Sequence, residues 1–260
     1  MLASAGNGRL PSYVTSDRIF RSLAPTETPQ GLAALVRLAT PPLEEALSRP
    51  SHGAGLAVAL IGLQDPGNLG TILRSLEAFG GAACLLGPDS VSPYNPKAVR
   101  ASAGSLFRVP VYRGVPPDKI LGLARRHGLQ AVALAPRASP ALNQLDLTKP
   151  TVFFIGREGS GLPDDLLKQV DRVARIPLAA GVESLNTAMA ASLALYEAAR
   201  QRGFKEYPWD CSSRRRERSA GHSPRRSPSA CGRRRSKSSS GRSTWSARAN
   251  RSGCRLKRTS

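Results

Sequence analysis

Five polar side chains in three short motifs are the candidates for chemistry in this chain. The motifs are Asp65-Pro66-Gly67-Asn68-Leu69-Gly70-Thr71-Ile72-Leu73-Arg74, Gly156-Arg157-Glu158-Gly159-Ser160-Gly161, and Glu183-Ser184-Leu185-Asn186-Thr187-Ala188. The candidate side chains within them are Asn68, Arg74, Glu158, Ser184 and Asn186. Amide, guanidinium, carboxylate and hydroxyl groups can position a reacting oxygen, take its proton or stabilise the charge that develops on it.

Each motif also has a purely structural interpretation. Asn68 can cap the helix that follows Asp65-Pro66-Gly67, and Ser184 can cap the alanine-rich helix after it. The glycines from Gly156 to Gly161 can form an ordinary tight connection. Their spacing, G-x-x-G-x-G, is not the G-x-G-x-x-G of dinucleotide-binding folds, which argues against a nucleotide-dependent oxidoreductase.

The elements that must position these residues follow an alternating pattern. Aliphatic runs without polar alternation suit strands buried on both faces of a parallel sheet; they are Leu56–Leu63, Ala82–Leu86, Gln130–Leu134 and Val152–Ile155. Helical spacing covers Leu69–Phe79, Pro117–His127, Pro163–Val170 and Ala188–Ala199, and a further strand is predicted to end at Ile176-Pro177-Leu178. This alternation predicts an α/β fold.

The three motifs, in this order, closely resemble the SpoU (TrmH-like) branch of the SPOUT methyltransferases. The resemblance extends over roughly residues 55 to 203. It implies a parallel sheet with a C-terminal trefoil knot and a homodimer. It also implies transfer of a methyl group from S-adenosylmethionine to a ribose 2′-hydroxyl of RNA, with no metal ion. We expect 23S rRNA as the substrate; tRNA, or an inactive RNA-binding relative, is the alternative.

The resemblance also assigns roles to residues. Asn68 would hold the ribose, Arg74 would act on its hydroxyl, Glu158 would order the site, and Ser184 and Asn186 would complete it. The predicted cofactor-binding residues are Gly156, Ile176, Leu185 and Leu134. Arg74 would be a general base or, fully charged, would stabilise the alkoxide. The second role is physically easier because a guanidinium titrates above about 12, but the sequence leaves both open.

The flanking regions differ from the central one. Residues 1–50 contain the stretch Thr28–Val36, which resembles the end of a small RNA-binding domain; a partial domain and a simple helical extension are both open. Residues 207–260 carry 16 basic and 2 acidic side chains and are rich in Arg and Ser. This segment is either a disordered RNA-binding arm or a frameshifted end.

Composition limits the class of protein. A formal net charge of +20 favours a polyanionic partner such as RNA. The longest apolar run is far below the roughly 20 residues that span a bilayer. The four cysteines form no Cys-x-x-Cys pair and the three histidines do not cluster, so neither a metal site nor a disulfide framework is expected. A cytoplasmic location fits these features.

Overall fold

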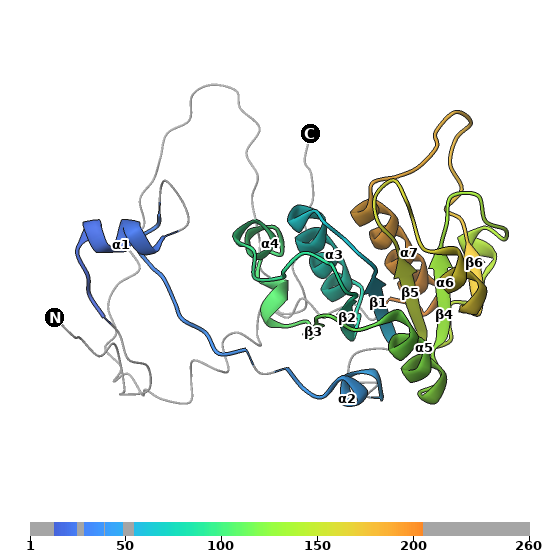
Figure 1. The fold of residues 1–260 in the computed structure, drawn as a ribbon, viewed down its shortest axis with the longest axis horizontal. Helices are drawn as coiled ribbons and strands as arrows, with labels where there is room; N and C mark the ends of the chain where they lie inside the picture. The colour runs from blue at the N-terminus through green and yellow to red at the C-terminus, as the bar shows by residue number, and fades with distance from the viewer. Residues whose placement is uncertain (1–12, 25–28, 39, 49–54, 205–260) are drawn as a thin grey trace, which may run out of the picture. The chain divides into compact units, whose positions relative to one another are not determined.

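The computed structural model describes residues 13–24, 29–38, 40–48 and 55–204 (Figure 1). The predicted basic tail, residues 207–260, lies outside the described residues. In chain order the elements are α1 (Asp17–Leu23), α2 (Leu43–Ser48), β1 (Leu56–Leu60), α3 (Pro66–Ala78), β2 (Ala83–Leu86), α4 (Pro96–Ala101), η1 (Ser105–Phe107), β3 (Val111–Tyr112), α5 (Pro117–Arg126), β4 (Gln130–Leu134), η2 (Leu142–Gln144), β5 (Thr151–Ile155), α6 (Asp164–Gln169), β6 (Arg172–Ala174) and α7 (Thr187–Gln201).

The six strands form one sheet in the order β3-β2-β1-β5-β4-β6, which can be followed from left to right in Figure 1. Every neighbouring pair is parallel. The α/β class with a parallel sheet is therefore confirmed. Because parallel strands all end at the same edge, the loops that follow them gather there, which is where ligands bind in open α/β sheets.

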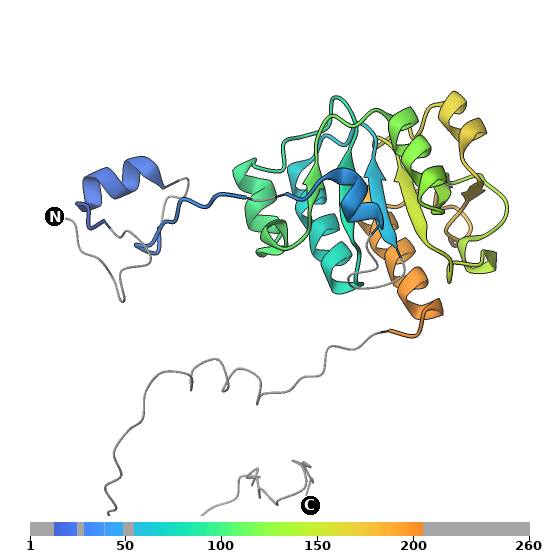
Figure 2. The same ribbon diagram turned by 90° about the horizontal axis from the view of Figure 1, so that it is seen from below.

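Helices cover both faces of the sheet (Figure 2). In β1, Leu56, Val58 and Leu60 belong to one hydrophobic cluster with α3 and α7, while Ala57 and Ala59 belong to a second cluster with α2 and α5. All five residues of β1 are buried. The aliphatic run lacks polar alternation because both of its faces contact helices.

Helix α3, which carries the first motif, is held between α4 and α7. A Cβ on Gly70 would lie 2.5 Å from the Cβ of Ala101 and 2.6 Å from the Ala98 carbonyl oxygen, so glycine permits the close approach of α4. On the other side, the hydroxyls of Ser75 in α3 and Ser192 in α7 are 2.7 Å apart. The helix that presents Asn68 is thus fixed from two directions.

The bounds predicted for the last strand are wrong. Strand β6 ends at Ala174, so Ile176 and Pro177 lie beyond it. Proline has no N–H for the ladder, and at Arg175 the chain already bridges to Ala141 in the loop between β4 and β5. Strand β3 has two residues, both only partly buried, and lies at the edge of the sheet.

Helix α1 is short, and none of its residues is buried. Residues 29–38 form neither helix nor strand, and Leu32 and Leu35 are exposed by 88% and 105%. By contrast, α2 is attached to the sheet region, since Tyr112 donates a hydrogen bond to the Pro41 carbonyl oxygen just before it. A partial RNA-binding domain in residues 1–50 stays a prediction.

Within the described ranges, no helix combines the length and the apolar character needed to cross a bilayer. Cys84 lies in β2 and is completely buried, and this burial raises the pKa of its thiol to about 12. A thiol protonated at neutral pH is a poor nucleophile, so Cys84 is a core residue.

Candidate active site

The three motifs meet at the carboxyl edge of the sheet because of strand order. The first motif follows β1, the second follows β5, and these two strands are neighbours. The third motif follows β6 and opens α7, which packs against α3, β1 and β5. Segments separated by about a hundred residues in the chain thereby lie side by side.

The first motif begins with a capped helix, and Asp65 provides the cap. Its carboxylate accepts a hydrogen bond from the Asn68 backbone N–H at 2.7 Å, and Pro66 occupies the first helical position. The interpretation of Asn68 as the cap is therefore wrong. Because the cap is already made, the Asn68 side chain is free to contact other motifs.

Asp65 is also joined to α4. The Lys97 Nζ lies 2.9 Å from the Asp65 Oδ2, and both side chains are partly exposed. The hydrogen bond from Lys97, together with that from the Asn68 backbone, lowers the pKa of the Asp65 carboxyl below its ordinary value. The carboxylate that starts α3 is thus charged at neutral pH and tied to a neighbouring helix.

We expect Asp65→Ala to lower the free energy of unfolding by about 1 kcal/mol, the usual cost of losing a helix cap. Since the folded pKa is lowered, this contribution is present at neutral pH and is lost as the pH falls through that folded value. Urea unfolding of both proteins between neutral pH and pH of about 3 would measure it. Asp118→Ala, which removes an exposed carboxylate from the first turn of α5 where Pro116 is the cap residue, is the matched control. Equal losses in the two variants, at every pH, would contradict the role of Asp65.

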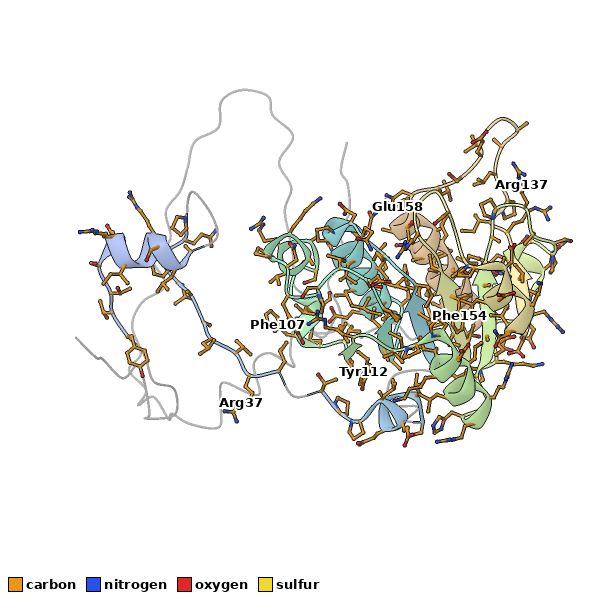
Figure 3. The ribbon with its side chains drawn as sticks, in the orientation of Figure 1. Arg37, Phe107, Tyr112, Arg137, Phe154 and Glu158 are labelled. Carbon is orange, nitrogen blue, oxygen red and sulfur yellow. The ribbon has the colours of Figure 1, made fainter. Side chains whose placement is uncertain are left out.

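A directional chain of hydrogen bonds links the three motifs. The Asn186 Nδ2 donates to the Asn68 Oδ1 at 3.1 Å, and the Asn68 Nδ2 donates to the Glu158 Oε1. The orientation of both amides is dictated by their partners, since a carboxylate only accepts and the Asn186 Oδ1 is already engaged. In Figure 3, Glu158 lies at the upper end of α3 and α7.

Asn186 anchors this chain because it caps α7. Its Oδ1 accepts from the backbone N–H groups of Ala188 at 2.9 Å and Met189 at 3.3 Å. The interpretation of Ser184 as the cap of this helix is therefore wrong. Ser184 is exposed, two residues before the cap. The cap leaves the Asn186 amide nitrogen to donate to Asn68, so one residue both starts the helix and orders the site.

The second motif folds into a tight loop over Gly156. The backbones of Arg157 and Gly161 exchange two hydrogen bonds, at 3.1 and 3.0 Å, and Gly159 and Gly161 have φ of +88° and +69°. Gly156 is buried beneath this loop, and a Cβ there would overlap the Gly161 carbonyl group. Glycine is required at this position for the loop to close, and the closed loop carries Glu158.

The predicted cofactor residues lie mostly on neighbouring strands. Gly156 follows β5, Leu134 ends β4, and Ile176 lies just after β6, and these strands are adjacent in the sheet. Leu134 and Ile176 are partly buried against the same hydrophobic cluster, and Leu185 is partly buried before α7. Apolar side chains beside a strand-end backbone suit a nucleoside such as the adenosine of S-adenosylmethionine.

Arg74 stands apart from the hydrogen-bonded chain. It lies six residues after Asn68 in α3, a separation of roughly 9 Å along the axis and about 240° around it. Its side chain is exposed and makes no hydrogen bond or ion pair with the residues that the structure describes. The structure thus joins Asn68, Glu158 and Asn186, and leaves Arg74 and Ser184 without contacts to them.

Three residues at this edge of the sheet were not among the predicted site residues. Asp65 before Pro66 is a recognisable helix-start signal and could have been found from the pattern alone. Lys97 and Arg157 carry no such signal. The Arg157 side chain crosses Gly62, and its guanidinium lies 3.8 Å from the Asp89 carboxylate, which connects the second motif to the loop after β2.

Comparison with known proteins agrees with this geometry. Residues 55–196 match the model of the SpoU rRNA Methylase family. The chain is 38% identical over 199 residues to an uncharacterized tRNA/rRNA methyltransferase of Synechocystis, covering 76% of this chain and 70% of that protein. It is 32% identical to the 23S rRNA (guanosine(2553)-2′-O)-methyltransferase of Bacillus subtilis, covering 71% of each.

A solved structure shows the same relationship. The rRNA methyltransferase of Sinorhizobium meliloti, with AdoMet bound, aligns with a TM-score of 0.57 and 36% identity over 62% of this chain and 61% of that one. The chain spans about half the length of several mycobacterial relatives that it matches. Since the family model covers more than half of the sequence and the three motifs meet in the fold, the chain belongs to the SpoU rRNA methylase family of S-adenosylmethionine-dependent RNA methyltransferases.

Proposed function

We propose that this protein transfers a methyl group from S-adenosylmethionine to a ribose 2′-hydroxyl of RNA. The observation that carries the proposal is the hydrogen-bonded chain from Asn186 through Asn68 to Glu158, beside the closed Gly156 loop. We favour 23S rRNA, which the name of the Bacillus subtilis relative specifies, and tRNA is the alternative substrate. An inactive RNA-binding relative would be expected to have lost one or more of these three hydrogen-bonded residues.

The residues divide the chemical task. When bound, S-adenosylmethionine supplies the electrophilic methyl group. Glu158 keeps one carboxylate oxygen outside its bond to Asn68, and this oxygen can accept a hydrogen bond from the ribose. Arg74 would stabilise the alkoxide as a cation or take the proton as a base.

The cofactor would be held by the neighbouring ends of β4, β5 and β6. Gly156 would contribute backbone groups, and Leu134, Ile176 and Leu185 would contact the adenine. Ser184 lies in the exposed loop before α7 and would complete the site when substrate orders that loop. These roles are inferred from the position and chemistry of each residue, and each role can be tested by mutation.

Three larger proposals accompany this activity. Residues 55–203 form the catalytic domain, and residues 1–50 and 207–260 add RNA-binding segments. After β6 the chain returns across the sheet so that α7 packs against α3, and this return path supports the C-terminal trefoil knot. A cytoplasmic location suits an enzyme whose substrate is ribosomal RNA.

The homodimer is supported by an apolar stripe on α7. Met189, Leu193 and Tyr196 are 53%, 39% and 44% exposed, and their spacing of four and three residues places them on one face. We expect Leu193→Lys to convert the dimer to a monomer in light scattering, because a charge would be buried in the interface. The control is Lys119→Leu on α5, which should leave the mass unchanged. A dimeric Leu193→Lys variant would place the interface elsewhere.

Methyl transfer from tritium-labelled S-adenosylmethionine into unmodified 23S rRNA and tRNA tests the function. The RNA is digested and its nucleosides are separated afterwards. Label in a 2′-O-methylnucleoside from 23S rRNA is expected. Label found only in tRNA would identify tRNA as the substrate, and label in a base would refute ribose methylation. Cofactor binding without label in either RNA would favour the inactive relative.

A further inference from the structure

A cavity lies at the edge of the sheet, outside the predicted site residues. It measures about 230 Å³ and is formed where β2 and β3 end. Its polar side chains are Asp89, Ser90 and Arg113. This volume is below the roughly 300–1,000 Å³ of pockets that enclose drug-sized ligands, so it suits one base or sugar better than a whole cofactor.

The cavity is tied to the candidate active site by direct contacts. Ser90 Oγ accepts from the Gly62 backbone N–H at 3.1 Å, and the Val91 N–H donates to the Leu63 carbonyl oxygen at 2.7 Å. Arg157, next to Glu158, ion-pairs with Asp89 at 3.8 Å. The loop that leads into α3 and the loop that carries Glu158 therefore fix where the cavity lies.

Arg113, which lines the cavity, contacts an aromatic ring beside it. The Arg113 guanidinium lies over the Tyr94 ring, 5.9 Å from its centroid. Tyr94 is 50% exposed and lines a neighbouring hollow of about 290 Å³ with Phe107, which is 53% exposed. Figure 3 places Phe107 beside α4 and β3. Tyr94 thus lies between two hollows, along the β3 side of the molecule.

We propose that this cavity and Tyr94 bind an unpaired nucleotide that flanks the methylated one. The inference rests on the proposed function and names a contact of the same RNA. A base would stack on the exposed Tyr94 ring, and Arg113 would contact the backbone phosphate or the base edge. Exposed aromatic rings beside arginine are the usual means by which proteins hold unpaired RNA, because every base has a stacking face.

The charge of the surface favours RNA over a protein partner. Arg113 has no carboxylate partner among the residues that the structure describes, so its charge is available to a phosphate. The acidic residue of the cavity, Asp89, is offset by Arg157. Arg100, exposed in nearby α4, adds a further cation.

The experiment compares Tyr94→Ala, Tyr94→Phe and Arg113→Ala in the full chain. Fluorescence anisotropy measures binding of a short unpaired RNA oligonucleotide, and calorimetry measures S-adenosylmethionine binding. We expect Tyr94→Ala to weaken oligonucleotide binding about tenfold, within the range for loss of one base–aromatic stack. Tyr94→Phe keeps the ring and should bind normally. With unmodified 23S rRNA, Tyr94→Ala should raise KM and leave kcat unchanged.

The controls separate this subsite from general charge and from the cofactor site. Arg126→Ala removes the same charge from α5, where Arg126 pairs only with exposed Glu44, and should bind as the wild type does. Arg113→Ala should reduce affinity more than Arg126→Ala. Equal affinity in all variants would overturn the subsite, as would loss of S-adenosylmethionine binding in Tyr94→Ala with oligonucleotide binding intact.

The outcomes also distinguish this inference from the proposed function. A wild-type protein that methylates RNA, with a Tyr94→Ala variant identical in KM and affinity, would refute the subsite alone. A wild-type protein that transfers no methyl group, yet binds the oligonucleotide through Tyr94, would refute the enzyme and keep the subsite. Tyr94-dependent capture of a peptide without RNA binding would assign the surface to a protein partner and overturn the proposal.

Discussion

Arg74→Ala is expected to lower kcat for methyl transfer at least about a hundredfold, the usual loss when a group that stabilises a developing oxyanion is removed. Calorimetric binding of S-adenosylmethionine should be nearly unchanged. Arg74 is exposed and makes no hydrogen bond or ion pair with the described residues, so neither the fold nor the predicted cofactor residues depend on it. The free energy of unfolding should change by less than about 0.5 kcal/mol, as for other surface substitutions.

Two controls sharpen this prediction. Arg126→Ala removes an equal charge far from the motifs and should keep full activity. Arg74→Lys keeps a charge but loses the planar donor group, so partial recovery would favour charge stabilisation and no recovery would favour a specific guanidinium contact. If Arg74→Ala instead loses cofactor binding and turnover equally, Arg74 belongs to the cofactor pocket and its catalytic role is wrong.

Gly156→Ala is expected to abolish activity by a different route. The added Cβ would overlap the Gly161 carbonyl group and come within 2.5 Å of the Leu162 nitrogen, and backbone cannot rotate away as a side chain would. The loop must shift, which moves Glu158 and costs about 1–3 kcal/mol of stability. We expect S-adenosylmethionine to bind at least about tenfold more weakly, equivalent to about 1.4 kcal/mol. Urea unfolding and calorimetry measure the two effects.

Gly122→Ala is the matched substitution. Gly122 lies within α5, and a Cβ there would meet nothing within 4 Å. This variant should be stabilised by about 0.4–1 kcal/mol, because alanine restricts the unfolded chain and favours the helix. Wild-type cofactor affinity in Gly156→Ala would show that cofactor binding does not depend on the closed loop, and would remove Gly156 from the binding site.

The sequence by itself determined the class of the fold, and it predicted candidate members of the site. The predicted strand Gln130–Leu134 agrees with β4 to the residue, whereas β1 ends at Leu60 and not at the predicted Leu63. Short aliphatic runs suit strands that are covered on both faces. Helices α3 and α5 were found from their helical spacing, although α3 begins at Pro66 and not at the predicted Leu69. The motifs also identified Asn68, Glu158 and Asn186 as candidates, but not the contacts among them.

Only the tertiary structure decided how those residues are used. Asn186 contacts Asn68 across 118 positions of the chain, and Asn68 contacts Glu158 across 90. Such pairings depend on the order of strands in the sheet, which local periodicity does not encode. Asn186 and not Ser184 caps α7, and only the folded backbone shows this, because its path decides which oxygen reaches the free N–H groups. The same holds for Tyr94 and Arg113, which belong to different loops and meet because β2 and β3 are paired.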